Sequence, residues 1–256
     1  VIYGFAFLST AASHQFLQLV GGVHPERRRR GIGRHLLEHI LESMSAYNGK
    51  IGLISRAFLD EEYSIGFFTH FNFREVDRLI WSKRSVFEPF SEKSYSKLAS
   101  FEASNLRMIT GNEFERVRKD WRKVWWSFTM ETCSDIPSKI SFEEIPFEEW
   151  KHFLDPPMLN RKHSIVMLDG MEMIGLLNLG EVEDGNININ YTAVKSDYRR
   201  RGLSRILKMK AFVLAKAYGA QYVTTQNHHL NPMLHINKKL GFVEEAIDVS
   251  FKKMLS

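Results

Sequence analysis

Two arginine-rich turns are the residues best suited to bind a ligand in this 256-residue chain. The first has the sequence RRRGIG over Arg28–Gly33, and the second has RRRGLS over Arg199–Ser204. Each follows a strand-like segment that ends in valine and precedes a segment with apolar residues at helical spacing. In such a turn the backbone N–H groups point inward, glycine permits close approach, and the helix N-terminus adds partial positive charge. The pattern predicts that both turns bind a phosphate-bearing ligand.

Each turn must be held between a strand and a helix. In the first copy we expect strands over Val1–Leu8 and Phe16–Val20, joined by a turn at Thr10–His14, and a helix over Arg34–Tyr47. In the second copy, Asn186–Val194 alternates polar and apolar residues, which predicts a strand with one polar face. The remaining patterns predict a strand at Ile51–Ser55, a helix at Glu62–His70, a strand pair at Phe73–Phe87, a strand at Leu106–Thr110, a long helix from an Asn112 cap to Met130, a helix at Phe147–Leu154, and a hairpin of Ser164–Leu168 and Glu172–Leu179.

Composition agrees with a protein of about two domains. The formal net charge of +5 suits an anionic ligand, but it also suits nucleic acid. Cys133 is the single cysteine, so no disulfide framework can form, and a reducing compartment such as the cytoplasm is expected. No apolar run is long enough for a membrane helix, so we expect no membrane partner.

The two turns, each with a strand before and a helix after, resemble the pyrophosphate-binding signature of the GNAT superfamily of acyl-CoA-dependent N-acetyltransferases. From about Leu106 to the C-terminus the second copy is similar to the mycothiol-synthase-like branch, including Asn231-Pro-Met-Leu234 and the later Leu240-Gly-Phe242. The resemblance implies an α/β (α+β) protein with tandem GNAT folds, each a mixed, mostly antiparallel twisted sheet with helices on both faces. Oligomeric state is not indicated by the sequence.

The resemblance also predicts the domain boundaries. We expect an incomplete N-terminal GNAT domain at residues 1–88, a linker at 89–104 and a complete C-terminal GNAT domain at 105–256. The first copy has few residues before Val23, so it lacks the opening elements of the fold. We therefore expect the natural protein to extend beyond Val1.

Acetyl-CoA is the expected co-substrate, and the two turns supply its expected binding residues. Asn227 and Asn231 either end a strand and cap a helix or contact the pantetheine arm. The predicted cofactor-binding residues are Val194, Arg199, Arg200, Arg201, Gly202, Leu203, Ser204, Asn227 and Asn231 in the second copy, and Val23, Arg28, Arg29, Arg30, Gly31, Ile32 and Gly33 in the first.

In the family, the N–H of the valine before the turn polarises the acetyl carbonyl, and a tyrosine on the last helix protonates the thiolate. Asn237 and Phe68 occupy the tyrosine position, and neither can donate as that acid does. The usual carboxylate base is replaced by Asn188 and Leu17. Asn188, with Asn190 and Thr192, could order a water relay, and the reserve bases are Glu181, Glu183, His228 and His229. The predicted catalytic residues are Asn188 and Asn237.

Three functions stay open from the sequence. The first is an N-acetyltransferase that works in the second domain on a primary amine of a small molecule or peptide. The second is a non-catalytic acyl-CoA-binding or regulatory module, since the usual acid and base are absent. The third, least favoured, is nucleic-acid binding through the arginines. The Trp- and Phe-rich segment Trp121–Pro157, with acids such as Glu131 and Asp135, is expected to shape a site for a cationic acceptor. No metal site is expected.

Overall fold

The computed structural model describes residues 1–10, 15–44, 47, 49–136, 144–155 and 159–255. Its contacts divide the chain into two compact units, Val1–Leu79 with Ala246–Ser256, and Ile80–Glu245. Among the described residues, none of the helices combines the length and apolar character needed to span a bilayer.

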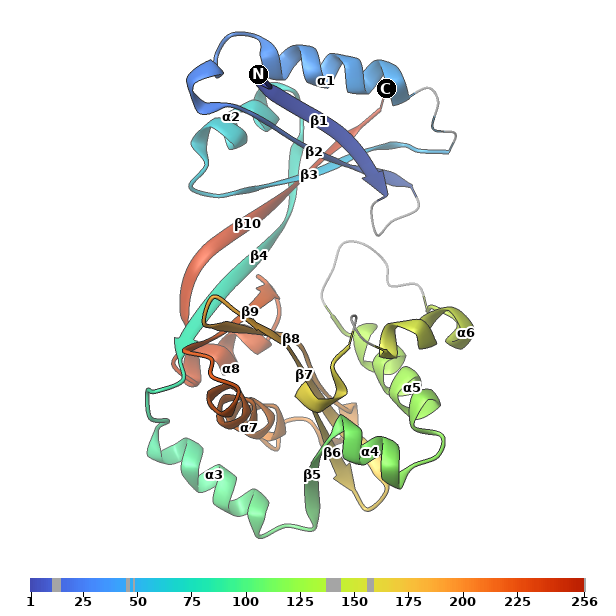
Figure 1. Cartoon of the computed structure of the whole chain (residues 1–256), viewed down its shortest axis with the longest axis vertical. Helices are drawn as coiled ribbons and strands as arrows, with labels where there is room; N and C mark the ends of the chain where they lie inside the picture. The colour runs from blue at the N-terminus through green and yellow to red at the C-terminus, as the bar shows by residue number, and fades with distance from the viewer. Residues whose placement is uncertain (11–14, 45–46, 48, 137–143, 156–158, 256) are drawn as a thin grey trace. The chain divides into compact units, whose positions relative to one another are not determined.

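The first unit contains a sheet in the order β1-β2-β3-β10 (Figure 1). β1 (Gly4–Thr10) is antiparallel to β2 (Phe16–Val23), which is parallel to β3 (Gly52–Phe58). The last strand of the chain, β10 (Val243–Met254), pairs with β3 in the antiparallel direction. The helices of this unit are α1 (Ile32–Ser43) and α2 (Glu62–His70), with a 3-10 turn at Pro25–Arg27.

One face of this sheet is packed. Leu37 and Ile40 of α1 meet Leu17, Leu53 and other apolar residues in a single core. Phe5 and Phe7 of β1 stack on each other on the opposite side and are about half exposed, at 52% and 50%. The described part of the first unit therefore has helices packed on one side of its β1–β2 pair.

The second unit contains the strands β4-β9-β8-β7-β6-β5 in that order (Figure 1). All neighbours from β5 to β8 are antiparallel, whereas β8 and β9 are parallel. The strands are β4 (Arg74–Ser85), β5 (Leu106–Thr110), β6 (Ser164–Asp169), β7 (Glu172–Glu183), β8 (Asn186–Val194) and β9 (Tyr222–His228). The helices are α3 (Glu92–Glu102), α4 (Gly111–Val117), α5 (Trp121–Cys133), α6 (Phe147–Trp150), α7 (Leu203–Ala217) and α8 (Met233–Lys239), with 3-10 turns at Lys151–Leu154, Arg161–His163 and Ser196–Tyr198.

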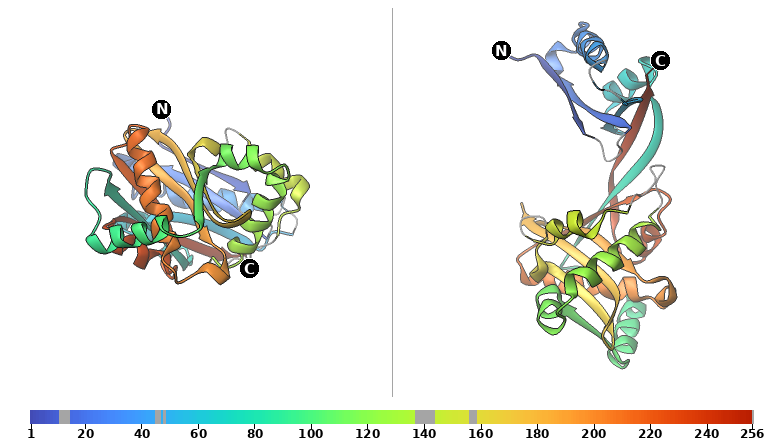
Figure 2. Two further views of the ribbon diagram at one scale, coloured as in Figure 1. Left: turned by 90° about the horizontal axis from the view of Figure 1, so that it is seen from below. Right: turned by 90° about the vertical axis from the view of Figure 1, so that its right-hand side faces the viewer.

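Helices cover both faces of the second sheet (Figures 1 and 2). On one face, α7 packs Ile206 and Leu207 against Ile187 and Ile189 of β8. On the other, Trp125 and Phe128 of α5 pack against Leu176 of β7. A mixed, mostly antiparallel sheet between two helical layers is the fold that the sequence predicted.

The closing strands are divided differently from the expected domain boundaries. Residues 246–256 were expected in the second domain, yet Asp248–Met254 of β10 pairs with β3 and lies in the first unit. Ile80–Ser85 of β4 lies in the second unit, where β4 neighbours β9. The buried strand β3 needs a partner for its outer backbone groups, and β10 supplies it.

The local elements differ from the expected ones at several points. The segment predicted as a linker, residues 89–104, contains helix α3 over Glu92–Glu102, and Phe73–Phe87 contains one strand, β4, rather than a strand pair. The single helix expected over Asn112–Met130 is two helices, because Arg118 has an extended backbone and ends α4. Thr110, not Asn112, caps α4. The expected turn at Thr10–His14 falls mostly on residues 11–14, outside the described residues.

Candidate active site

The second arginine turn has the geometry of an anion-binding loop. Its backbone is left-handed at Arg200 (φ 62°) and at Gly202 (φ 83°), and Gly202 directly precedes α7. Non-glycine residues rarely adopt a positive φ, so the left-handed backbone of Arg200 marks a constrained turn of the kind found at functional sites. Among the described residues no side chain caps α7, so the first-turn N–H groups of Leu203 and Ser204 are not bonded to a capping side chain. An anion in the loop would satisfy them.

The N–H group of Val194 points into a wedge between β8 and β9. Lys195 donates its backbone N–H to Ile174 O of β7 at 2.9 Å. In an antiparallel pair, residues that exchange hydrogen bonds alternate with residues that do not. The backbone N–H of Val194, which lies opposite Gly175, is therefore directed away from β7. The parallel pairing of β8 with β9 has its last pair at Ile189 and Thr225, although β8 continues to Val194. The Val194 N–H therefore faces the region where the two strands no longer pair.

Arg199 ties the loop to the end of this strand. Its Nε donates to Val194 O at 2.9 Å, and its guanidinium forms an ion pair with Asp135 beyond α5. Arg201 donates to Asp197 O and lies over the Tyr198 ring, 4.9 Å from the ring centroid. The three arginines predicted as ligands thus lie on one turn, where Arg199 and Arg201 have structural partners.

The first turn has nearly the same conformation. Arg29 has φ 62° and Gly31 has φ 83°, and no side chain caps α1 in the described part of the chain. Arg28 Nε donates to Val23 O at 3.3 Å, as Arg199 does to Val194. The pairing of β2 with β3 likewise has its last pair at Gln18 and Ile54, before β2 reaches Val23. Both copies therefore hold Arg-x-x-Gly loops of one geometry.

A β-bulge in β8 decides which way the asparagines face. The pairing with β7 shifts between Tyr191 and Ile189, which leaves Asn190 as an extra residue. Because Ile187, Ile189 and Val194 all belong to the core beneath α7, Asn188 lies on the opposite face.

Thr192 lies on the α7 side by alternation with Val194, so the expected row of Asn188, Asn190 and Thr192 on one face is wrong. Asn188 and Asn190 do meet: Asn188 Nδ2 donates to Asn190 Oδ1 at 2.6 Å, and Thr224 Oγ1 donates to Asn188 Oδ1 at 3.2 Å.

The other predicted asparagines form local bonds. Asn237 is buried and donates from Nδ2 to Asn227 Oδ1 at 2.7 Å, which joins α8 to the end of β9. Among the described residues the Asn237 Oδ1 has no hydrogen-bond partner. Asn231 accepts from the backbone N–H of Met233 at 2.9 Å and so helps to begin α8. In the first copy Phe68 is buried against Phe251, which excludes an acid there.

A hydroxyl cluster on the α5 side was missed by the sequence analysis. Tyr191 OH bonds Thr132 Oγ1 at 2.5 Å, and Cys133 Sγ donates to the same tyrosine oxygen at 3.6 Å. Burial raises the pKa values of both Tyr191 and Cys133, so these groups stay protonated at neutral pH. The bulge turns Tyr191 toward α5, and no local sequence signal shows this.

The acids expected near an acceptor are partly engaged. Asp135 pairs with Arg199, and Glu131 lies 3.9 Å from Lys195 Nζ. Trp121 and Trp125 are core residues, at 3% and 1% exposed, while Trp126 donates to Ile145 O at 2.8 Å. Part of the expected acceptor segment, residues 137–143 and 156–158, lies outside the described residues.

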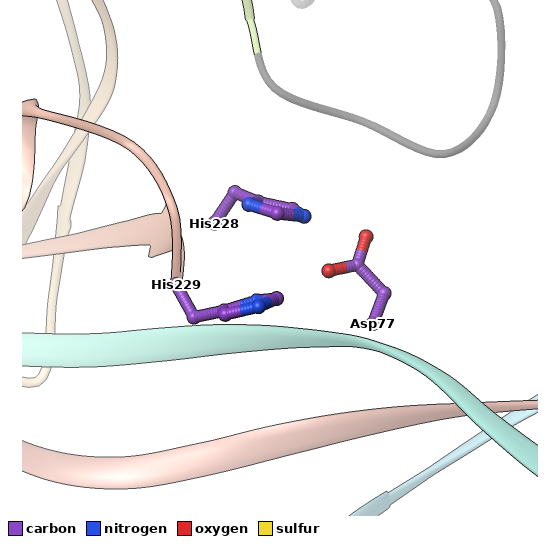
Figure 3. A group of neighbouring side chains, drawn as sticks. All are labelled: Asp77, His228 and His229. Atoms are coloured by element: carbon purple, nitrogen blue, oxygen red, sulfur yellow. The ribbon is translucent and has the colours of Figure 1, made fainter.

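The two adjacent histidines stack at the end of β9 (Figure 3). The ring centroids of His228 and His229 are 4.5 Å apart, with 28° between the planes. His228 is buried, and its Nδ1 accepts the backbone N–H of Leu230 at 3.1 Å. This bond makes Nδ1 the acceptor nitrogen of the ring.

Comparisons with known proteins agree with this geometry. A model described as Acetyltransferase (GNAT) domain matches residues 1–75, and a model described as Acetyltransferase (GNAT) family matches residues 119–242. No curated protein matches the sequence.

Solved structures share the fold over nearly the whole chain. A GCN5-related N-acetyltransferase from Sphaerobacter thermophilus is 15% identical with a TM-score of 0.73, covering 98% of this chain and 76% of its own. A tandem GNAT protein from the clavulanic acid biosynthesis pathway is 16% identical with a TM-score of 0.68, covering 98% and 79%. A GNAT acetyltransferase from Colwellia psychrerythraea is 10% identical with a TM-score of 0.61, covering 96% and 80%. The chain therefore contains two GNAT acetyltransferase domains in tandem.

Proposed function

We propose that this chain transfers acetyl from acetyl-CoA to a primary amine of a small molecule or peptide, and that the second domain is the working site. The observation that carries the proposal is the Val194 N–H, directed into the wedge beside the uncapped loop at Gly202. The loop would hold the diphosphate on backbone amides, and the Val194 N–H would stabilise charge on the carbonyl oxygen. Acetyl-CoA, when bound, supplies an activated thioester.

The choice of the second domain rests on its polar groups. It has Asn188, bonded to Asn190, and Asn237 where the first copy has buried Leu17 and Phe68 at the matching sequence positions. Asn188 and Asn190 can hold a water that receives the amine proton and passes it to solvent. The first domain would then bind acetyl-CoA without catalysis, as a regulatory copy. Kinship with the mycothiol-synthase-like branch stays part of the proposal, as does a cytoplasmic location.

A charge placed in each loop tests this division. Gly202→Glu puts a side chain at φ 83° and a carboxylate beside the expected phosphates, so acetyl-CoA binding and thiol release should fall at least about tenfold. Gly31→Glu should leave thiol release intact while one class of binding site is lost in calorimetry. Gly219→Glu is the matched control, because Gly219 has φ 84° at the other end of α7.

The reverse result, with turnover lost in Gly31→Glu and kept in Gly202→Glu, would contradict the assignment of catalysis to the second domain.

A non-catalytic acyl-CoA-binding module is the second candidate function. It is favoured by Asn237 and Phe68, which occupy the sequence position of the family's acidic tyrosine. Tight acetyl-CoA binding without thiol release across a panel of amines would establish it instead.

A further inference from the structure

The side chain of Lys97 lies against the glycine of the second loop. A β-carbon on Gly202 would meet Lys97 Cδ at 3.1 Å and Lys97 Nζ at 3.6 Å. In the first loop the corresponding neighbour of Gly31 is His35, from the next turn of the loop's own helix. The second loop therefore has an added cation that comes from a separate helix.

Helix α3 holds Lys97 in place from within the same compact unit. Ser94 is fully buried and Phe101 is 7% exposed, and Leu98 packs on the core that also contains α7. Ser91 and Ser94 hydroxyls bond each other at 3.0 Å at the start of the helix. Lys97 thus projects from a packed platform toward the N-terminal end of α7.

The loop beside Lys97 is rich in cations. Arg199, Arg200 and Arg201 lie on the loop, and the α7 N-terminus adds partial positive charge. Arg199 has Asp135 as a counter-ion, but Lys97 and Arg200 form no ion pair within the described part of the chain. Cations gathered in this way repel each other, and a bound anion offsets that repulsion.

We propose that Lys97 is a phosphate ligand of the second site, binding a phosphate of coenzyme A through its ammonium group beside the loop amides. The inference rests on the proposed function of that loop. Coenzyme A carries two kinds of phosphate, the diphosphate and the 3′-phosphate, and both have oxygens that accept from an ammonium. Lys97 would make the second site tighter for coenzyme A than the first.

Calorimetric titration of the full chain tests this inference. A Gly31→Glu background silences the first loop, and Lys97→Met is added to it. We expect roughly tenfold weaker coenzyme A binding and a shallower dependence of affinity on salt, because a charged hydrogen bond is lost. Lys97→Arg should restore most of the affinity. Lys93→Met removes the same charge from an exposed site on α3 and should change nothing.

A parallel titration with 3′-dephospho-coenzyme A identifies the phosphate. If Lys97→Met weakens both ligands equally, Lys97 binds the diphosphate; if it weakens coenzyme A alone, Lys97 binds the 3′-phosphate. Either pattern supports the inference. If Lys97→Met binds both ligands as tightly as Lys93→Met does, the inference about Lys97 is overturned, while the proposed function stands. No binding by the Gly31→Glu parent would overturn the proposed function and this inference together.

Discussion

Lys208 is a charged residue type placed inside the core of the second domain. It is 1% exposed on α7, and its Nζ lies 5.7 Å from the centroid of the Phe242 ring. Leu37 holds the same position after the first loop glycine and is also buried. Burial lowers the pKa of Lys208 to about 7, because the ammonium loses its hydration. The second copy therefore carries a stability cost that the first does not.

Lys208→Met should stabilise the protein most at pH 7 and below. In the unfolded chain the lysine pKa returns to about 10.4, so between about pH 7 and 10 the unfolded state holds a proton that the folded state has released. The free energy of unfolding of the native sequence then rises with pH, and that of the methionine variant lacks this increase. Urea unfolding at several pH values checks this. An advantage that is unchanged up to pH 10, or one that Lys210→Met at an exposed site of α7 reproduces, would contradict it.

At the scale of elements, α4 begins with a capping box at Thr110. The backbone N–H of Glu113 donates to Thr110 Oγ1 at 3.2 Å, and the backbone N–H of Thr110 donates to Glu113 Oε2 at 2.7 Å. The Thr110 backbone N–H and the Thr110 hydroxyl, which donates to Glu113 Oε2 at 2.9 Å, lower the pKa of the Glu113 carboxyl. Two N–H groups at the start of the helix are thereby satisfied.

Thr110→Ala should therefore lower the free energy of unfolding by about 1 kcal/mol, since the capping oxygen is lost. Asn112→Ala is the matched control, because Asn112 lies within the first turn of α4 and should change stability by less than about 0.5 kcal/mol. Chemical denaturation measures both. If Asn112→Ala lowers the free energy of unfolding more than Thr110→Ala does, Asn112 is the cap, as the sequence suggested.

The sequence predicts elements whose signals are local. The loops at Gly31 and Gly202, the hairpin of β6 and β7 and the strand Asn186–Val194 each follow from residues adjacent in the chain, and the structure contains them. The bulge at Asn190 was missed because it depends on how β7 pairs across the sheet. That single insertion decides which face Asn188 and Tyr191 occupy, so the asparagine row was predicted incorrectly.

At the scale of the molecule, the order of elements along the chain does not fix which strands pair. The first copy ends at Asn72-Phe73 and the second at Gly241-Phe242, and each is followed by a long strand, β4 or β10. The two halves of each of these strands lie in different units. The pairing of β10 with β3 is non-local and has no signature in composition or periodicity. That residues 105–256 fold as one domain therefore remains a prediction, and a mutation in β10 can test it.

Phe251→Ala should destabilise the first unit, although Phe251 lies at the C-terminal end of the chain. Phe251 is 4% exposed and stacks on Phe68, with ring centroids 5.0 Å apart, so truncation removes core contacts worth about 3–5 kcal/mol. Hydrogen exchange should then show faster exchange of the β3 amides, with β6 and β7 unchanged. Val223→Ala, in the core of the second unit, should have the opposite pattern. Faster exchange in β6 and β7 of Phe251→Ala, with β3 protected, would mean that residues 105–256 fold as one domain and that β10 belongs to it.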